Sequence, residues 1–470
     1  MRVLPKGWPP LLLGASLSAC AVGPDFRPES AATLKVPAQY QSVDGAARTP
    51  VNLATWWTSF DDPVLAQLVT RALAANNDID AAEARLRAAR ASVKGARGAL
   101  LPGLSGSASA ANSEVVNGAG IGGDSYQVGL DASWEADIFG GNRRSLEASR
   151  ATAQGARATL YDVQRSIAAE VALNYIDARN TQARLAVARA NLGYQDETVQ
   201  IAGWRVQAGL VSALDVEQAK VLRAQTAATI PQLEQSYASA TNRIAVLTGE
   251  APGAVTPLLD VRTAIPLAPD AVETGLPADL LRRRPDVMAS EASLAAEVAR
   301  IGVAEAQLYP ALRLSGSLSS SAFSLGDIGS SILGNLVGSL TAPIFQGGQL
   351  RARVEGQRAT ADAALASYRG TVLRALEDVE NALVAIDKTK AREAALAVAE
   401  TSAQTSVLYA RNRYRAGLID FQTLLESERS LLSSQDSRTS ARAARATASV
   451  QLYKALGGGW SLDDISGMRP

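Results

Sequence analysis

The sequence predicts a mainly α-helical protein that also carries a membrane-type β part and that arose by internal duplication. Three observations support this fold class: long helical stretches, four segments of alternating polarity, and one order of elements that occurs twice. Aromatic residues make up only 5% of the 470 residues, and alanine dominates the apolar fraction. Such a composition is typical of long helices that pack closely with few bulky side chains.

The N-terminus predicts export and a covalent lipid. Positive charge at Met1, Arg2 and Lys6 precedes an apolar run, 11–15, that is far shorter than the roughly 20 residues of a membrane-spanning helix, so we interpret it as a signal peptide. Leu17-Ser18-Ala19-Cys20 resembles the bacterial lipobox, in which the cysteine is acylated and becomes the mature N-terminus. Ala21 is not the aspartate that commonly retains such proteins at the inner membrane, which implies sorting to the outer membrane.

Cys20 is also the single cysteine of the chain. Once it is acylated, no thiol remains, and we expect no disulfide. A chance buried thiol behind an ordinary secretory signal is the alternative interpretation.

The duplication is visible in matched landmarks. Asp78 lies 24 residues before Pro102 and Asp286 lies 24 residues before Pro310, so the copies are offset by 208 residues. Tyr161 recurs as Tyr368 at nearly the same offset. Repetition at a fixed offset indicates two copies of one structural unit.

Each copy is predicted to contain a helix, two strands, a Phe-Gly corner and a long helical hairpin. The predicted segments are a signal peptide (1–19), a lipid-anchored extended segment (20–61), a first repeat (62–250), an equatorial linker (251–285), a second repeat (286–458) and a tail (459–470).

Four segments of about 11 residues, 102–112, 126–137, 312–322 and 332–342, alternate between apolar and polar residues. The stretch YQVGLDASWEAD, which begins at Tyr126, shows the pattern most cleanly, and the last segment shows it least. Alternation separates the two faces of a strand, and about 9–11 residues suffice for a tilted strand to cross a bilayer. A soluble sheet packed on helices is disfavoured, since the chain offers no helical layer with enough large apolar residues to cover it.

Four strands cannot close a barrel by themselves. An open edge in lipid leaves backbone groups unsatisfied at several kcal/mol each, and membrane barrels begin at about eight strands. We therefore expect a barrel shared between copies of the chain, with 8 strands from two copies or 12 from three.

The helical stretches predict long coiled-coil hairpins. Apolar residues recur at steps of three or four between Leu160 and Ala178 and again between Leu365 and Ile386. Few helix breakers interrupt 142–207, and a helix of that length reaches on the order of 100 Å. This length suits a conduit across the periplasm better than a compact domain.

A glycine-containing turn is predicted at the far end of each hairpin, at Gly209-Leu210 and at Gly417-Leu418. Glycine permits the left-handed residue that ends a helix, and Ser212 or Asp420 can cap the helix that follows.

Acidic residues near these turns are candidates for a gate, because rings of like charge around a symmetric pore set selectivity and can control opening. The candidates are Asp215, Asp420 and Glu426. Ordinary helix capping and a solvated face explain each of them equally well.

Catalytic, metal and cofactor sites are not expected. The chain has no histidine, and its formal net charge of zero argues against a nucleic-acid partner. Gly118–Gly123 fits GxGxxG by letter but joins two predicted strands, so we interpret it as a loop. Arg282–Arg284 is interpreted as a solvated helix entrance, with an anion-binding patch as the alternative.

Taken with these features, several motifs make the chain resemble the TolC-like outer-membrane efflux proteins, in particular the lipoprotein branch that serves resistance-nodulation-division pumps. The resemblance covers almost the whole chain after the lipobox. Its markers are Cys20 to Phe26, Trp56-Trp57 with Phe60 and Asp62-Pro63, Leu280 to Val287, and Tyr414 through Gly417 to Leu425.

The resemblance implies a homotrimer with a 12-stranded barrel in the outer membrane and a 12-helix tunnel in the periplasm. It implies that the tip turns, with Gly209, Leu210, Gly417 and Leu418, dock onto a periplasmic adaptor protein bound to an inner-membrane pump. Family members close the tips through tyrosine, arginine and aspartate contacts.

Tyr414 falls on the family's tyrosine position and Glu426 on a position that is usually aspartate. Thr423 and Ile419 replace an aspartate and an arginine found in some members, and Asp420 is a candidate substitute.

We therefore expect a passive exit duct for small compounds, with a periplasmic gate, a lipid on Cys20 and no other cofactor. A type I protein-secretion duct of the same fold and a non-transporting lipoprotein scaffold are the alternatives, and an enzyme is the least expected class.

Overall fold

The computed structural model describes residues 21–41, 52–118, 122–269 and 277–461. The chain divides into two compact units, which we describe separately. The strand unit comprises residues 1–30, 84–157 and 289–370, and the hairpin unit comprises 31–83, 158–288 and 371–470. The predicted signal peptide and Cys20 lie outside the described residues.

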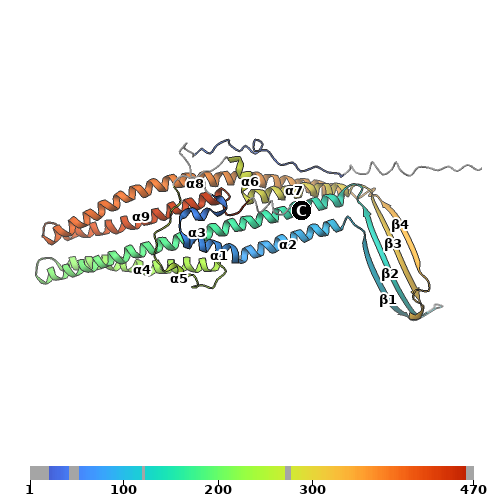
Figure 1. The fold of residues 1–470 in the computed structure, drawn as a ribbon, viewed down its shortest axis with the longest axis horizontal. Coiled ribbons are helices and arrows are strands. Elements are labelled where there is room, and N and C mark those ends of the chain that lie inside the picture. The colour runs from blue at the N-terminus through green and yellow to red at the C-terminus, as the bar shows by residue number, and fades with distance from the viewer. Residues whose placement is uncertain (1–20, 42–51, 119–121, 270–276, 462–470) are drawn as a thin grey trace, which may run out of the picture. The chain divides into compact units, whose positions relative to one another are not determined.

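The strand unit contains one antiparallel sheet with the order β1-β2-β3-β4 (Figure 1). Its strands are β1 (Gly103–Ser113), β2 (Gly123–Ala136), β3 (Ala311–Ala322) and β4 (Leu333–Thr341). β2 pairs with β3, with Leu130 opposite Leu318, so the sheet joins the two sequence repeats. β2 begins three residues earlier than predicted, because Gly123 to Ser125 continue the pairing with β1.

The register places apolar side chains on one face of the sheet, where they remain exposed: Leu104, Val128, Leu130, Leu314, Leu318 and Leu336. Serine and charged residues occupy the other face, including the ion pair of Arg313 with Glu135 at 3.3 Å. Leu333 and Val337 of β4 lie on this polar face, which accounts for the weaker alternation of the last predicted strand. Within the part of the chain that the structure describes, β1 and β4 are each paired along one edge only.

The structure confirms that the GxGxxG stretch is a connection between two strands. Gly118 to Gly122 lie between β1 and β2, so the GxGxxG stretch leads from strand to strand and not into a helix; residues 119–121 lie outside the described set. A short 3-10 helix, η3 (Leu325–Asp327), lies between β3 and β4.

The helices confirm the duplication. α2 (Asn77–Gly98) and α7 (Pro285–Ala306), which precede the two strand pairs, have 22 residues each. α3 (Gly141–Gln207) and α8 (Gln349–Arg415) have 67 residues each, and α4 (Ala213–Leu247) and α9 (Phe421–Ala455) have 35 each. α3 with α4, and α8 with α9, form the two long hairpins (Figure 1).

The N-terminal part of the hairpin unit is more ordered than the predicted extended segment. η1 (Leu53–Phe60) is a 3-10 helix whose Trp56 is fully buried and stacks on Tyr453 at 5.2 Å. α1 (Pro63–Ala75) follows, capped by Asp62, which also accepts a hydrogen bond from the Tyr175 hydroxyl at 2.7 Å. The expectation of an extended segment through 61 was therefore wrong for its last residues, because two tryptophans and a phenylalanine need burial.

In the described residues of the predicted equatorial linker, 251–269 and 277–285, the structure has three short helices: α5 (Thr256–Leu259), η2 (Pro277–Asp279) and α6 (Leu280–Arg283). Buried Arg179 of α3 holds the linker by donating hydrogen bonds to the carbonyls of Leu259 and Val261 at 2.9 and 2.7 Å.

Arg284 corrects the expectation of a solvated arginine run. It is only 4% exposed and forms ion pairs with Asp286 at 2.6 Å and Asp378 at 2.9 Å. A buried guanidinium is stable only when it is paired, and two carboxylates supply that pairing.

Among the described helices, none has the length and apolarity that a membrane crossing requires.

Candidate functional site at the hairpin tips

Both hairpins turn through a glycine in the left-handed region. Gly209 has φ +71° and Gly417 has φ +74°. Each turn closes when the amide of the next residue donates to a helical carbonyl: Leu210 to Arg205 and Leu418 to Arg413, both at 2.9 Å. This bond pattern requires a residue with positive φ, which glycine adopts without strain.

Leu210 and Leu418, the predicted docking residues, are 68% and 73% exposed. The two turns therefore present one projecting leucine each, and their docking role stays a prediction.

The helices that follow the turns are capped as the sequence indicates. Ser212 accepts from the Leu214 amide at 3.2 Å, and Asp420 accepts from the Thr423 amide at 2.7 Å. That hydrogen bond and a second one from the Thr423 side chain lower the pKa of the exposed Asp420 carboxyl. Asp420 thus has a capping role, and a gating role for it stays a prediction.

A buried apolar cluster joins all four helices at the tips, and we call it the tip core. Its members come from α3, α4, α8 and α9: Ala202, Ala219, Leu222, Ala410, Tyr414, Phe421, Leu424 and Leu425. Because both hairpins contribute, separation of the tips would expose these residues to water at a cost of roughly 25 cal/mol per Å².

Tyr414 is the central contact of the tip core. It is 3% exposed, and its ring packs on Phe421 with centroids 5.3 Å apart. Arg205 of α3 lies over the same ring at 4.5 Å and donates a hydrogen bond to the Tyr414 carbonyl at 2.8 Å. Burial raises the pKa of Tyr414, and the nearby charge of Asp215 acts in the same direction, while Arg205 opposes it. Of the predicted gate residues, Tyr414 belongs to the tip core, and Asp215 lies close enough for its charge to act on it.

Glu426 is placed differently. Its side chain is 72% exposed and lies 3.9 Å from Arg429 of the same helix. It is not a member of the tip core, and a role between neighbouring copies stays a prediction.

Glu428 is a site residue that the sequence analysis missed. It is 3% exposed, and its Oε1 accepts hydrogen bonds from Thr198 of α3 at 2.9 Å and from Arg411 of α8 at 3.0 Å. Burial raises the pKa of Glu428, against the opposing effects of Thr198 and Arg411. The sequence pattern could have predicted that Glu428 is buried, because it continues the helical spacing of Phe421, Leu424 and Leu425, which are buried on the same helix.

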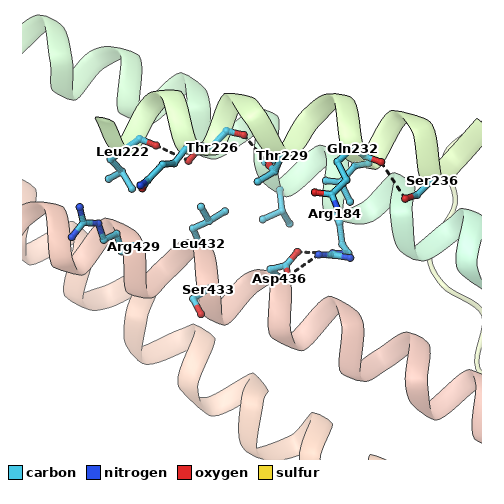
Figure 2. A pocket seen from close by; sticks show the side chains of 14 residues that line it. Arg184, Leu222, Thr226, Thr229, Gln232, Ser236, Arg429, Leu432, Ser433 and Asp436 are labelled. Carbon is cyan, nitrogen blue, oxygen red and sulfur yellow. Dashed lines mark hydrogen bonds and ion pairs between the residues drawn. The ribbon is translucent and has the colours of Figure 1, made fainter. Parts of the chain in front are cut away.

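Further bonds tie the hairpins together away from the tip core. Glu197 of α3 pairs with Arg415 of α8 at 2.6 Å, and Arg184 of α3 pairs with Asp436 of α9 through two bonds of 2.6 and 3.1 Å. Figure 2 shows the Arg184–Asp436 pair at the border of a groove of about 420 Å³, with α4 on one side and α9 on the other.

Leu222 of α4 and Leu432 of α9 line this groove from its two sides (Figure 2). The hairpins are therefore fastened along α3 but leave an open groove between α4 and α9.

The described residues contain no group of three or more histidine, cysteine, aspartate or glutamate side chains placed to hold a metal ion. Four of the pairs named above connect one hairpin with the other: Arg205–Tyr414, Thr198–Glu428, Glu197–Arg415 and Arg184–Asp436.

The structure combines two long helical hairpins with one four-stranded sheet, which both sequence repeats build and whose apolar face is exposed. These features define a channel protein of the outer membrane. A family profile described as "Outer membrane efflux protein" matches residues 68–250 and again 276–458. The chain belongs to this family, which confirms the predicted fold class, the outer-membrane localisation and the predicted role as an efflux duct.

Individual relatives agree. The pyoverdine export outer membrane protein OpmQ of Pseudomonas aeruginosa is 34% identical over 92% of this chain and 92% of its own length. Nodulation protein T of Rhizobium leguminosarum bv. viciae is 34% identical over 96% of this chain and 93% of its own.

Among solved structures, the outer-membrane channel OprN superposes with a TM-score of 0.87 at 37% identity, covering 94% of this chain and 100% of its own. The open-state structure of the MtrE outer membrane channel of Neisseria gonorrhoeae gives a TM-score of 0.81 at 27% identity and covers 94% of this chain and 99% of its own.

Proposed function

We propose that three copies of this chain form the outer-membrane exit duct of a tripartite efflux system, with a gate at the hairpin tips. Among the strands that the structure describes, the outer edges of β1 and β4 have no partner, and this supports the shared barrel, since an open edge in lipid leaves its backbone groups unsatisfied. Three chains would give 12 strands, with the exposed leucine face toward lipid and the serine face toward the passage.

The single observation that carries the gate is the fastening of one hairpin to the other at the tips. Arg205 of α3 holds Tyr414 of α8, and Thr198 of α3 is bonded to Glu428 of α9. An adaptor that bound the projecting turns at Leu210 and Leu418 could draw the hairpins apart and break these bonds. Energy would come from an inner-membrane resistance-nodulation-division pump.

The N-terminus supports a second part of the proposal. The lipobox predicts a lipid on Cys20, and the lipid together with the barrel would fix the protein in the outer membrane. No other cofactor and no nucleic-acid partner is proposed.

Crosslinking tests the gate. Cysteines introduced near Tyr414 and near Asp215, on hairpins that neighbour each other in the trimer, are expected to block export when they are oxidised and to restore it on reduction. Because the one native cysteine would be acylated, the introduced thiols would be the only free ones. Unchanged export by a fully crosslinked trimer would refute a gate at the tips.

Conductance distinguishes the duct from a non-transporting lipoprotein scaffold. The purified protein in planar bilayers should conduct ions, whereas a lipoprotein scaffold should not. The matching family profile is described as an outer membrane efflux protein, and it gives no support to the type I secretion duct.

A further inference from the structure

The first described residues of the chain lie against the corner between β2 and α3. The Val22 amide donates a hydrogen bond to the Phe139 carbonyl at 3.0 Å. Ala21 packs directly on Gly140, which has φ +79°. This corner follows the last residue of β2, Ala136, so the N-terminal segment is held at the end of the sheet from which α3 begins. We call this end the foot of the sheet.

Arg144, in the first turn of α3, binds this segment through several hydrogen bonds. Its guanidinium donates to the carbonyls of Val22 and Gly23, both at 3.0 Å, and to the Asp25 carboxylate at 2.8 Å. A further bond to Glu147 at 2.8 Å fixes the side chain on its own helix. Arg144 is only 5% exposed, so its charge is buried among partners, most of which belong to the N-terminal segment.

Three glycines, Gly23, Gly140 and Gly302, allow the segment to pack closely at this corner. We call this packing site the seat. A Cβ on Gly23, which has φ +93°, would lie 2.4 Å from the Gly302 Cα, and a Cβ on Gly140 would lie 2.6 Å from the Ala21 Cα. A Cβ on Gly302 would meet both the Val22 carbonyl and the Arg144 side chain at 2.7 Å. Atoms this close leave no room for other side chains, so the seat fits this segment in one position.

The second repeat offers a comparison within the same chain. Its corner has glycines at 347 and 348 and an arginine, Arg351, three residues after the second glycine, as Arg144 stands three residues after Gly141. Nothing lies within 4 Å of a Cβ built on either glycine, and Arg351 is exposed. Lys94 stands where the 208-residue offset places the counterpart of Gly302. Of the two corners, only the first is built to receive the N-terminal segment.

We propose that Arg144 is a positioning residue that holds residues 21–25 at the foot of the barrel, so that the acyl group on Cys20 enters the bilayer directly beside the strands. The inference rests on the proposed acylation of Cys20, which immediately precedes the held segment. Phe139, whose carbonyl accepts from Val22, stacks on Tyr309 at 4.6 Å. Tyrosine is enriched at the boundary between membrane and water, which agrees with a position of this corner near the bilayer. Docking of the segment would thus couple the lipid anchor to correct insertion of the sheet.

Amide exchange of the N-terminal peptide in the full-length, detergent-solubilised protein tests the docking. In the native protein the Val22 amide should be protected. Arg144→Ala should lower this protection by about tenfold or more, because the carbonyls of Val22 and Gly23 lose their donors. Arg144→Lys should fall between the two, since an ammonium cannot reproduce the planar fork of donors. Arg150→Ala, at an exposed position of the same helix, is the matched control and should change nothing.

Two further readouts test the anchor. Incorporation of labelled palmitate should be equal in the native protein, Arg144→Ala and Arg150→Ala, and the share of labelled protein that resists urea extraction from membranes should fall several-fold in Arg144→Ala alone. Unchanged protection in both Arg144 variants would overturn the docking, and lost protection with full membrane resistance would overturn the positioning role. Absence of palmitate from the native protein would overturn the acylation and with it the anchor role, whereas conductance and crosslinking at the tips would still test the duct.

Discussion

Arg205 of α3 holds Tyr414 of α8 in two ways, through a 2.8 Å hydrogen bond to its carbonyl and through contact of the guanidinium with the ring face at 4.5 Å. The two residues belong to different hairpins and to different sequence repeats. A single side chain therefore fastens one hairpin to the other at the end that we propose opens.

Arg205→Ala is expected to loosen the tips. Loss of one hydrogen bond and one cation–π contact should cost about 1–2 kcal/mol, enough to shift a closed–open equilibrium by roughly tenfold. The measurement is single-channel conductance in planar bilayers, which should show longer open times. Arg413→Ala, at an exposed position of α8 near the same turn, serves as the control, and equal open times in the two variants would contradict a fastening role for Arg205.

Glu428→Gln is expected to change how stability depends on pH. The pKa of Glu428 is raised in the folded protein by burial, so the folded state holds this proton more tightly than the unfolded state. The native protein therefore gains stability as the pH falls through the folded pKa and loses it as the pH rises. Glutamine keeps an acceptor for Thr198 and Arg411 but cannot titrate.

The measurement is thermal unfolding of the native protein and of Glu428→Gln at a series of pH values from below to above the pKa of Glu428. The stability of the variant relative to the native protein should increase with pH above the ordinary pKa of a glutamate. A constant difference at every pH would contradict a titrating Glu428.

Leu425→Ala tests the tip core. Leu425 is 1% exposed, and truncation of a buried leucine typically costs about 2–5 kcal/mol through lost burial and the cavity that remains. We expect faster proteolysis at the tips, read by mass spectrometry of the fragments. Leu418→Ala, at a residue that is 73% exposed, should leave proteolysis unchanged, and similar cleavage in both variants would mean that the tip core does not hold the hairpins.

Asp286→Asn is expected to weaken the protein most at neutral pH and least in acid. Burial raises the pKa of Asp286, but the hydrogen bond from Arg284 and the charges of Arg165 and Arg284 outweigh it and leave the pKa below its usual range. A lowered carboxyl pKa contributes stability above the unfolded-state value, and this contribution is lost as the pH falls through the folded pKa.

The unfolding midpoints of native protein and Asp286→Asn should therefore converge as the pH is lowered below about 4. Asp387→Asn removes an exposed carboxylate of α8 and provides the baseline. Midpoints that stay equally far apart in acid would show that the ion pairs of Asp286 contribute nothing.

The sequence by itself determined the periodic features of this protein. Alternation over 126–137 and 312–322 defined strands and their apolar face, because side chains of a strand point to opposite sides at a period of two. The matched Asp78–Pro102 and Asp286–Pro310 landmarks defined the duplication, and Gly209 and Gly417 defined the tip turns, because left-handed residues at helix ends favour glycine.

Only the tertiary structure decided which residues meet across the hairpins. Arg205 and Tyr414 are 209 positions apart, and Thr198 and Glu428 are 230 apart, so no local pattern connects them. The same holds for Arg144, whose partners Val22 and Asp25 lie about 120 residues away, and for Arg284, which sequence alone made a solvated charge. A polar side chain reveals its partner only when the fold removes both from water, since burial is what makes an unpaired charge too costly to keep.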